Sequence, residues 1–308
     1  ANKLYDLNFE EINNIDKYHE DVITYKVTDV ADNFVALFYA DFHPRPGKQN
    51  GAWMTSFNNQ FIKDGVNNRP HIVNVCNFTK PTETKPSLLT FGEVTTLFHE
   101  FGHALHGMLA NTTYPGLSGT SVYRDFVELP SQMLENWCYE KEALELFAFH
   151  YETGEIIPLE LIEKIKDSAN FMEATRMMRQ LSFGSVDMAW HSTKPSEIES
   201  VKAFETAAME ETRLYPISKG TCFSTAFSHI FQGGYSAGYY SYKWAEVLDA
   251  DAFEYFSKNG IFNKEIGTKF KEHILSKGGS EHPMELYKKF RGQEPDNEAL
   301  LRRSGLLQ

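Results

Sequence analysis

The chain has 308 residues, of which 42% are hydrophobic, and its 30 basic and 42 acidic side chains give a formal charge of −12. A chain of this length can bury a sizeable core without disulfides. The acidic balance argues against nucleic acid or an anionic membrane as a partner, because phosphate binding needs a surplus of Lys and Arg. No segment approaches the roughly 20 apolar residues that span a bilayer.

The cysteines and the start of the chain bear on its location. Cys76, Cys138 and Cys222 are too few and too scattered for a disulfide framework or a zinc finger, so we expect three reduced thiols. No basic segment precedes an apolar stretch, so no signal peptide is visible. The chain begins with Ala1 rather than Met, which indicates that the natural N-terminus is missing. We expect a cytoplasmic, monomeric protein.

The first part of the chain has the pattern of strands. Residues 1–20 are polar with a loose helical rhythm. The β-branched and aromatic runs 22–28 and 34–39 flank a short polar stretch and therefore predict a hairpin. Residues 52–57 and 71–78 are further strand candidates. Together they predict a small antiparallel β-sheet near the N-terminus.

After residue 90 the chain becomes helical almost to its end. Amphipathic stretches, punctuated by Gly and Pro, are expected at 91–110, 126–151, 159–190, 197–213, 236–257, 263–276 and 284–291. We therefore predict a mainly α (α+β) fold that forms one domain over 1–308, with its β-containing part at about 20–80 and its helical part at about 90–308.

The first of these helices carries a metal-binding pattern. Thr90 and Glu93 are spaced as a capping box that opens the helix. His99 and His103 are four residues apart, which places both imidazoles on one helix face where they can hold the same ion. Glu100 lies beside them, placed to take a proton from a water molecule. Zinc suits two imidazoles and a carboxylate, with a fourth position left for water.

Two alternatives to this ligand set concern nearby positions. His106 lies on the same face and could pair with His103, but that pair would leave Glu100 without a role. A third histidine at the spacing of the metzincins would fall on Leu109, so that family is excluded. The third ligand must come from elsewhere.

The segment 124–132 opens the next helix and offers a carboxylate, with Pro130 tolerable in the first turn. Glu128 lies between apolar neighbours and is expected to face inward, which is costly unless the carboxylate is paired or bound to a metal. We therefore predict Glu128 as the third ligand. Asp125 and Glu135 are both possible acceptors for the ligand imidazoles, and the sequence does not choose between them.

A tyrosine-rich segment lies in the C-terminal third. Tyr235, Tyr239 and Tyr242 are spaced i, i+4, i+7 and would share one helix face, after a flexible Gly233–Gly234 pair. Phenolic hydroxyls are good neutral donors to a developing oxyanion. The alternative is an aromatic stripe that only fills a core.

These segments together resemble the thimet oligopeptidase and neurolysin family of zinc peptidases, on the runs 99–106, 124–132 and 227–242. The bacterial peptidyl-dipeptidase (dipeptidyl carboxypeptidase) and oligopeptidase A branches are the most similar. The resemblance implies a large helical zincin catalytic domain without the family's N-terminal helical half. It also implies one Zn²⁺ per chain on His99, His103 and Glu128, catalysis by Glu100, Tyr242 and His229, and substrate binding by Tyr235 and Tyr239.

The function that follows is zinc-dependent hydrolysis of short peptides with release of C-terminal dipeptides. An endo-acting oligopeptidase of the same family is the alternative, and a non-catalytic peptide-binding protein is the alternative from another class. We also expect the strand at 71–78 to bind the substrate backbone by edge pairing.

Overall fold

The computed structural model describes residues 1–307. Its main sheet has the order β1-β2-β3-β7-β4, and β5 and β6 form a separate two-stranded ribbon. The strands are β1 (Asn8–Ile12), β2 (Ile23–Thr28), β3 (Phe34–Asp41), β4 (Trp53–Asn58), β5 (Phe61–Lys63), β6 (Val66–Asn68) and β7 (His71–Val75).

The sheet is mixed, whereas the sequence predicted an antiparallel one. The β2–β3 hairpin is confirmed as antiparallel, but β7 runs parallel to β3, with Leu37 opposite His71. The parallel pair arises because the chain passes through β4, β5 and β6 before β7 inserts between β3 and β4. The expectation that 71–78 is an edge strand is therefore wrong: β7 is paired on both sides, and the edge strand beside it is β4.

Strand β1 lies where the sequence indicated a helical rhythm. It pairs with β2 along its whole length, and the Phe9 ring lies 6.3 Å from Phe38 and 5.9 Å from Phe101, centroid to centroid. One aromatic side chain that packs on the sheet and on the next layer thus outweighs the weak local helical pattern.

The mainly helical α+β fold is confirmed. The helices are α1 (Asn2–Tyr5), α2 (Phe91–Met108), α3 (Leu129–Glu135), α4 (Lys141–Leu144), α5 (Leu159–Ala169), α6 (Glu173–Ser192), α7 (Val201–Ala208), α8 (Ser228–Phe231), α9 (Ser241–Asn259), α10 (Lys264–Phe270), α11 (Pro283–Arg291) and α12 (Asn297–Arg303). Among residues 1–307, none of them combines the length and the apolar character that a membrane crossing requires.

Two of the long predicted helices are divided. The stretch 126–151 contains α3, α4 and short 3₁₀ turns. The stretch 159–190 breaks between α5 and α6, where Met172 takes a left-handed conformation with a φ of 56°. Few L-residues adopt this conformation and none continues an α-helix through it.

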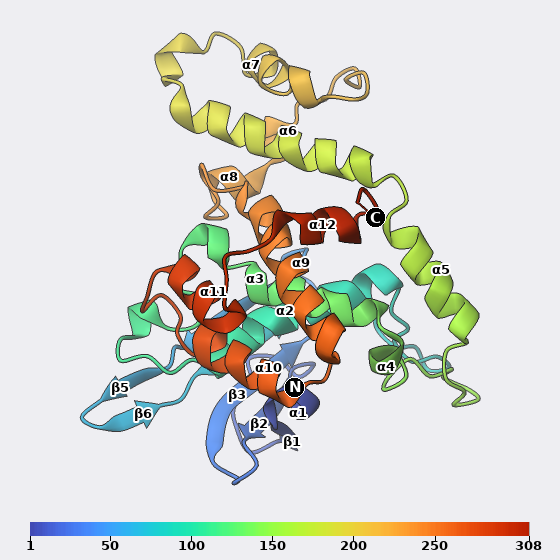
Figure 1. The fold of residues 1–308 in the computed structure, drawn as a ribbon, viewed down its shortest axis with the longest axis vertical. Helices are drawn as coiled ribbons and strands as arrows, with labels where there is room; N and C mark the ends of the chain where they lie inside the picture. Colours follow the sequence, from blue (N-terminus) through green and yellow to red (C-terminus); the bar gives the residue numbers. More distant parts are fainter. Residues whose placement is uncertain (308) are drawn as a thin grey trace.

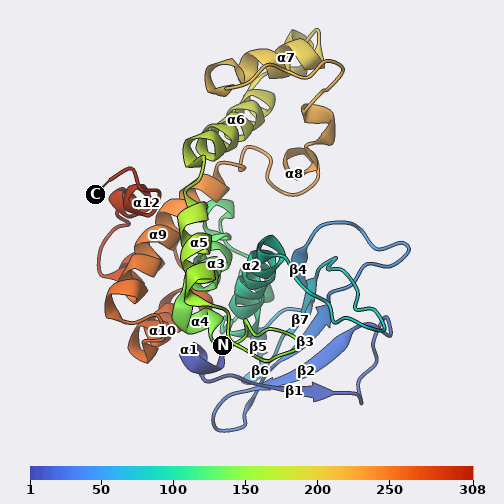
Figure 2. The same ribbon diagram turned by 90° about the vertical axis from the view of Figure 1, so that its right-hand side faces the viewer.

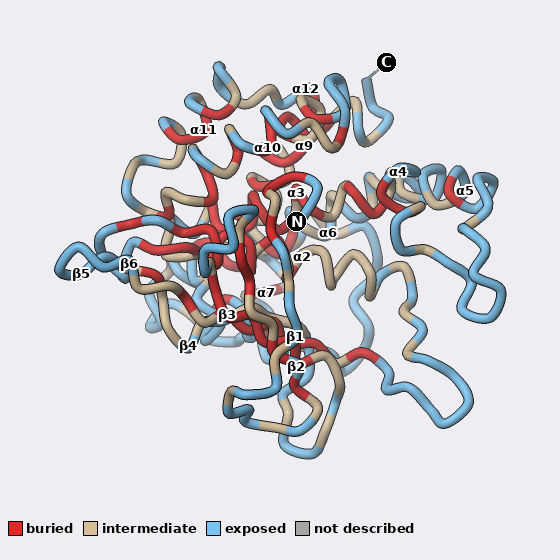
Figure 3. Tube along the Cα trace, turned by 90° about the horizontal axis from the view of Figure 1, so that it is seen from below, coloured by how far each residue is buried: buried red, intermediate tan, exposed pale blue. Residues whose placement is uncertain are grey.

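The elements form successive layers (Figures 1 and 2): the sheet packs against α2, α2 against α3, and α3 against α9. The buried residues gather in these layers, whereas the segment around α5 is mostly exposed or half-buried (Figure 3). Helices α6 and α7 stand apart from the sheet, at the opposite end of the molecule. The central position of α2 and α3 places their shared face next to the core.

Helix α2 is fixed at both ends. The predicted capping box is present, with Thr90 accepting from the Glu93 amide and the Glu93 side chain accepting from the Thr90 amide. At the other end the Arg69 guanidinium donates to the Met108 carbonyl at 2.6 Å and to the Ala110 carbonyl at 3.0 Å. A cation at a helix C-terminus also interacts favourably with the helix dipole. The histidine-bearing helix is therefore held in place before any ligand binds.

Candidate active site

Helices α2 and α3 bring the three predicted metal ligands together. The Nε2 atoms of His99 and His103 each lie 3.2 Å from the same oxygen, Oε2 of Glu128. The ligating atoms of the three residues lie within 4.8 Å of one another. Glu128 is the residue that precedes α3, and it is 1% exposed. The inward carboxylate that the sequence predicted is thus aimed at the histidine pair.

The three side chains are coupled electrostatically. Burial alone would raise the pKa of Glu128, but hydrogen bonds from His103 and His99 outweigh it and hold that pKa well below its usual range. Burial likewise would lower the pKa of His99, but its bonds to Glu128 and Glu135 raise it to about 10. The site therefore stabilises positive charge beside the carboxylate of Glu128, which stays ionised.

The donor set fits a divalent metal. Two imidazole nitrogens and one carboxylate oxygen converge on one point, and three protein ligands leave a position open for a reactant. The Nδ1 of His99 lies 2.6 Å from Oε1 of Glu135, a contact that fixes the orientation of the ring with Nε2 toward Glu128. The Nδ1 of His103 is buried and has no hydrogen-bond partner within residues 1–307.

Of the two acceptors that the sequence left open, Glu135 contacts a ligand imidazole and Asp125 does not. Asp125 accepts a hydrogen bond from the Tyr240 hydroxyl at 2.7 Å instead. The sequence also missed Ser131, whose hydroxyl donates to Oε2 of Glu128 at 2.9 Å. Its spacing of three residues from Glu128 on one helix was the available signal.

His106 takes no part in the cluster. It is fully buried, and burial lowers its pKa to about 3. Neither of its ring nitrogens has a hydrogen-bond partner within residues 1–307. A neutral histidine enclosed in this way is a core residue, so nothing in its surroundings favours the alternative pair with His103.

Glu100 directly follows His99 and is coupled electrostatically to the three ligand residues, but it is not one of them. It is 6% exposed, and burial raises the pKa of its carboxyl above the usual range. The backbone of Met54, on the edge strand β4, lies close enough to offset part of this rise. A carboxylate with a raised pKa beside a metal site is suited to accept and return a proton.

The tyrosines come together, although they do not share one helix face. Helix α9 begins only at Ser241, so Tyr235 and Tyr239 belong to the preceding turn and only Tyr242 is helical. The ring centroids of Tyr235 and Tyr242, and those of Tyr239 and Tyr242, are each 5.1 Å apart. The His229 ring, on α8, lies 6.0 Å from that of Tyr235. The three tyrosines and His229 are therefore close in space, but the turn before α9 brings them together and not the period of one helix.

Tyr235 joins this group to the metal ligands. Its hydroxyl donates to Oε1 of Glu128, and the guanidinium of Arg124 lies 4.7 Å from the centre of its ring. Burial and the Glu128 charge raise the pKa of Tyr235, and burial and the same charge raise that of Tyr242. Both phenols therefore stay protonated and can act as hydrogen-bond donors at neutral pH.

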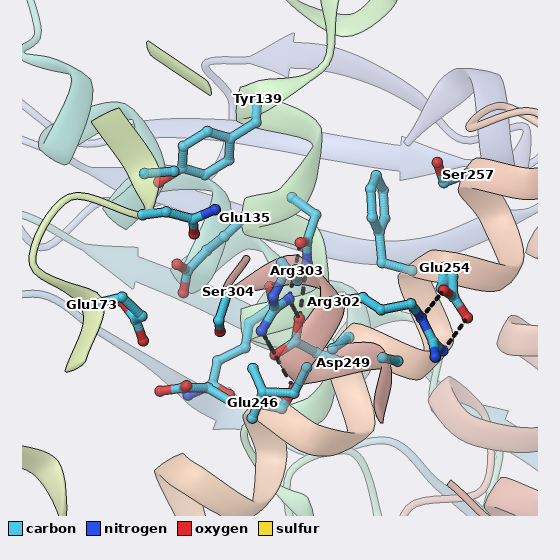
Figure 4. A pocket seen from close by; sticks show the side chains of 18 of the residues that line it. Glu135, Tyr139, Glu173, Glu246, Asp249, Glu254, Ser257, Arg302, Arg303 and Ser304 are labelled. Atoms are coloured by element: carbon cyan, nitrogen blue, oxygen red, sulfur yellow. Dashed lines mark hydrogen bonds and ion pairs between the residues drawn. The ribbon is translucent and has the colours of Figure 1, made fainter. Parts of the chain in front are cut away.

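A cavity of about 600 Å³ adjoins the site (Figure 4). Its walls come from α3, α6, α9 and α12, and ion pairs of Arg303 with Asp249 and of Arg302 with Glu254 line it. Glu135 also lines this cavity, and its side chain is 34% exposed. The acceptor of the His99 hydrogen bond is thus in contact with solvent.

The Glu135–His99 bond gives a testable expectation for metal affinity. We expect Glu135→Gln to weaken metal binding by about 10- to 100-fold, because a neutral amide orients the imidazole less strongly than a carboxylate does. Titration with a competing chelator measures the change. Asp125→Asn is the matched control, since Asp125 bonds to Tyr240, and equal affinities in the two variants would contradict the assignment.

Two histidines one helical turn apart with a glutamate after the first, and a carboxylate from the next helix, define the HExxH class of metallopeptidases. A family profile described as "Peptidase family M3" matches residues 1–306. The chain therefore belongs to Peptidase family M3, and the predicted family resemblance is confirmed.

Named relatives agree with this membership. The chain is 45% identical over 309 residues to oligopeptidase A of Escherichia coli (strain K12). It is 40% identical over 310 residues to dipeptidyl carboxypeptidase of the same organism. Each alignment covers 99% of this chain and 45% of the relative. The organellar oligopeptidase A of Arabidopsis thaliana is 43% identical over 301 residues, 94% of this chain and 38% of its own length. The chain thus spans less than half the length of these relatives.

Proposed function

We propose that the chain is the catalytic domain of a zinc-dependent peptidase that acts on short peptides. The observation that carries the proposal is the convergence of His99, His103 and Glu128, with Glu100 beside them. Zinc is the ion that this donor set suits best. Bound there, it would supply a Lewis acid that polarises the scissile carbonyl and lowers the pKa of a water molecule.

The chain's own residues supply the remaining steps. Glu100 takes the proton from the attacking water and later delivers it to the leaving amine. The hydroxyl of Tyr242 donates to the oxyanion of the tetrahedral intermediate, and His229 assists it. Tyr235, whose hydroxyl donates to Glu128 and whose ring stacks on Tyr242, binds the substrate beside Tyr242. Tyr239 packs behind Tyr242 and shapes the substrate side of the site.

The substrate backbone is proposed to bind along the edge strand β4. It is unpaired on the side away from β7 among residues 1–307, and the backbone of Met54 reaches Glu100. An extended peptide that pairs with β4 would bring one of its peptide bonds beside the catalytic carboxylate.

Within this class we propose the release of C-terminal dipeptides. Arg124 supports it: the side chain is exposed, it lies against Tyr235 and near Gly234, and it forms no ion pair with any residue in 1–307. A free guanidinium near the reacting group suits the α-carboxylate of a peptide. The oligopeptidase A relatives favour the second candidate, an enzyme that cleaves internally.

A pair of peptides separates these two modes. One has a free C-terminus, the other is identical but amidated, and mass spectrometry identifies the products. We expect stepwise loss of dipeptides from the free acid and little cleavage of the amide. We also expect Arg124→Gln to raise KM for the free acid by about tenfold, since it removes a charge-assisted pair.

Internal cuts in both peptides would establish the oligopeptidase mode instead. A protein that binds both peptides but cleaves neither would be the non-catalytic binder, which the presence of every ligand and of Glu100 argues against. Our proposal includes a cytoplasmic monomer whose partners are peptides, in keeping with the acidic charge of −12.

A further inference from the structure

Helix α6 carries a buried carboxylate that is hydrogen-bonded to the tyrosine segment. Asp187 is 0% exposed and directly follows Val186, in a region where α6 packs on Phe227 and Ile230 through an apolar cluster. A carboxylate in such surroundings is costly unless it is fully hydrogen-bonded. An apolar residue would fit the cluster better, so the carboxylate of Asp187 must have a role that an apolar side chain cannot fill.

The oxygens of Asp187 contact the backbone between the tyrosines. Oδ1 accepts from the Ala237 amide at 2.9 Å, and Oδ2 accepts from the Tyr239 amide at 2.8 Å. The Nδ1 of His191, one turn further along α6, lies 2.8 Å from Oδ1. No Lys or Arg within residues 1–307 pairs with this carboxylate. Its two oxygens therefore bond to two amides of the loop and to one imidazole.

The backbone that Asp187 holds is strained. Ala237 has a φ of 53°, a left-handed conformation that is rare for a residue with a side chain. Ala237 is exposed, so no packing of its own side chain enforces this conformation. Gly234 and Gly238 flank it and would let the segment rearrange. The two bonds from Asp187 tie it to α6, in addition to the bond from the Gly238 amide to the Tyr235 carbonyl within the turn itself.

The pinned amides lie between the two tyrosines that face the metal ligands. Tyr235 precedes Ala237 by two residues and is tied to Glu128 on α3. Tyr242 follows Tyr239 by three residues and stacks on Tyr235 with 24° between the ring planes. The stacked rings of Tyr235 and Tyr242 are thus held by Glu128, which precedes α3, and through the loop backbone by Asp187 of α6.

We propose that Asp187 is a positioning residue for the peptidase reaction. Its carboxylate fixes the backbone at Ala237 and Tyr239, so that the hydroxyls of Tyr235 and Tyr242 are placed before the substrate arrives. The effect on catalysis rests on the proposed function, whereas the anchoring of the loop does not. Preorganised donors stabilise a transition state because they need no rearrangement during the reaction.

The first test is Asp187→Asn, which keeps the shape but turns one acceptor into a donor that faces an amide N–H. We expect kcat to fall by about 10- to 100-fold while KM changes less than about threefold, because the loss is in the transition state. Metal content stays unchanged. Hydrogen exchange of the segment 236–242, read by mass spectrometry, becomes faster, whereas exchange of α2 does not.

Asp251→Asn is the matched control. Asp251 is equally buried, at 0% exposed, but it accepts from the Tyr287 hydroxyl at 2.6 Å and pairs with Arg291, away from the tyrosine segment. This variant is expected to lower Tm but to leave kcat and the exchange of 236–242 as they are. If it reduced kcat as much as Asp187→Asn does, general destabilisation would account for the effect and the proposal would be overturned.

A second pair of variants leaves the apolar cluster intact. Ala237→Val places a β-branched residue at a φ of 53°, which it does not tolerate, whereas Ala237→Gly accepts this conformation without strain. We expect kcat of the Val variant to be lower than that of the Gly variant by about fivefold or more, measured at a temperature at which both variants are folded. Equal kcat values would refute the positioning role even if Asp187→Asn failed to fold.

The exchange measurement tests the anchoring of the loop separately from the proposed function. An inactive wild-type chain would remove the proposed function, but faster exchange of 236–242 in Asp187→Asn would still support the anchor. An active wild-type chain with unchanged exchange and unchanged kcat in Asp187→Asn would remove the anchor and leave the proposed function intact.

Discussion

Replacing Glu100 by Gln is expected to lower kcat by about a thousandfold while the metal stays bound. The amide has nearly the same shape as the carboxyl group, but it cannot take the proton from the attacking water. Glu100 is not one of the three converging ligand residues, so the His99, His103 and Glu128 cluster is untouched. The loss corresponds to about 4 kcal/mol in the activation free energy.

Peptide cleavage kinetics and metal analysis on the same sample measure both parts of this expectation. Glu93→Gln is the matched control on the same helix, because glutamine also serves at the third position of a capping box. It should leave kcat and Tm nearly unchanged. A Glu100→Gln protein that is both loaded with metal and active would contradict the mechanism.

Replacing Gly102 by Ala is expected to damage the metal site without removing any of its ligands. A Cβ at this position would lie 2.4 Å from the Pro130 carbonyl oxygen and 2.6 Å from the Ser131 Cα. Both are backbone atoms of α3, so α2 and α3 must move apart. Because Glu128 directly precedes α3, its carboxylate moves away from the histidines. We expect a loss of about 1–3 kcal/mol in unfolding free energy and weaker metal binding by at least about tenfold.

Gly92→Ala on the same helix provides the comparison. Nothing lies within 4 Å of a Cβ at Gly92, so the alanine gains helix propensity without a clash. We expect a stability gain of up to about 1 kcal/mol and no change in metal affinity. Thermal unfolding and chelator competition distinguish the two variants. Wild-type Tm and metal affinity in Gly102→Ala would show that the close approach of α2 and α3 has no role.

The features that the sequence predicted best are local ones. The spacing of His99 and His103 and the capping box at Thr90 depend only on the geometry of one helix. The inward direction of Glu128 followed from its apolar neighbours. These patterns, together with the tyrosine-rich segment, were enough to indicate the family.

The features that the sequence could not predict depend on contacts between distant segments. The choice of Glu135 over Asp125 is set by how α3 crosses α2, which depends on the contact of Gly102 with Pro130. The tyrosine spacing suggested one helix, but the left-handed Ala237 interrupts it, and its amide bonds to a carboxylate of α6 that lies 50 residues away in the sequence. The parallel β3–β7 pair likewise has no local signal, because no short turn connects the two strands.

The position of β7 in the sheet makes the fold depend on pairing between distant segments. The β2–β3 hairpin closes a short loop, whereas the β3–β7 pair encloses the three strands that lie between them in the sequence. Helix α2 packs on the sheet that β7 completes, and the bond between Glu128 and Tyr235 joins residues 107 positions apart. The metal site therefore depends on contacts between segments that are far apart in the sequence. A metal ion that binds only the folded chain would stabilise all of these contacts together by mass action.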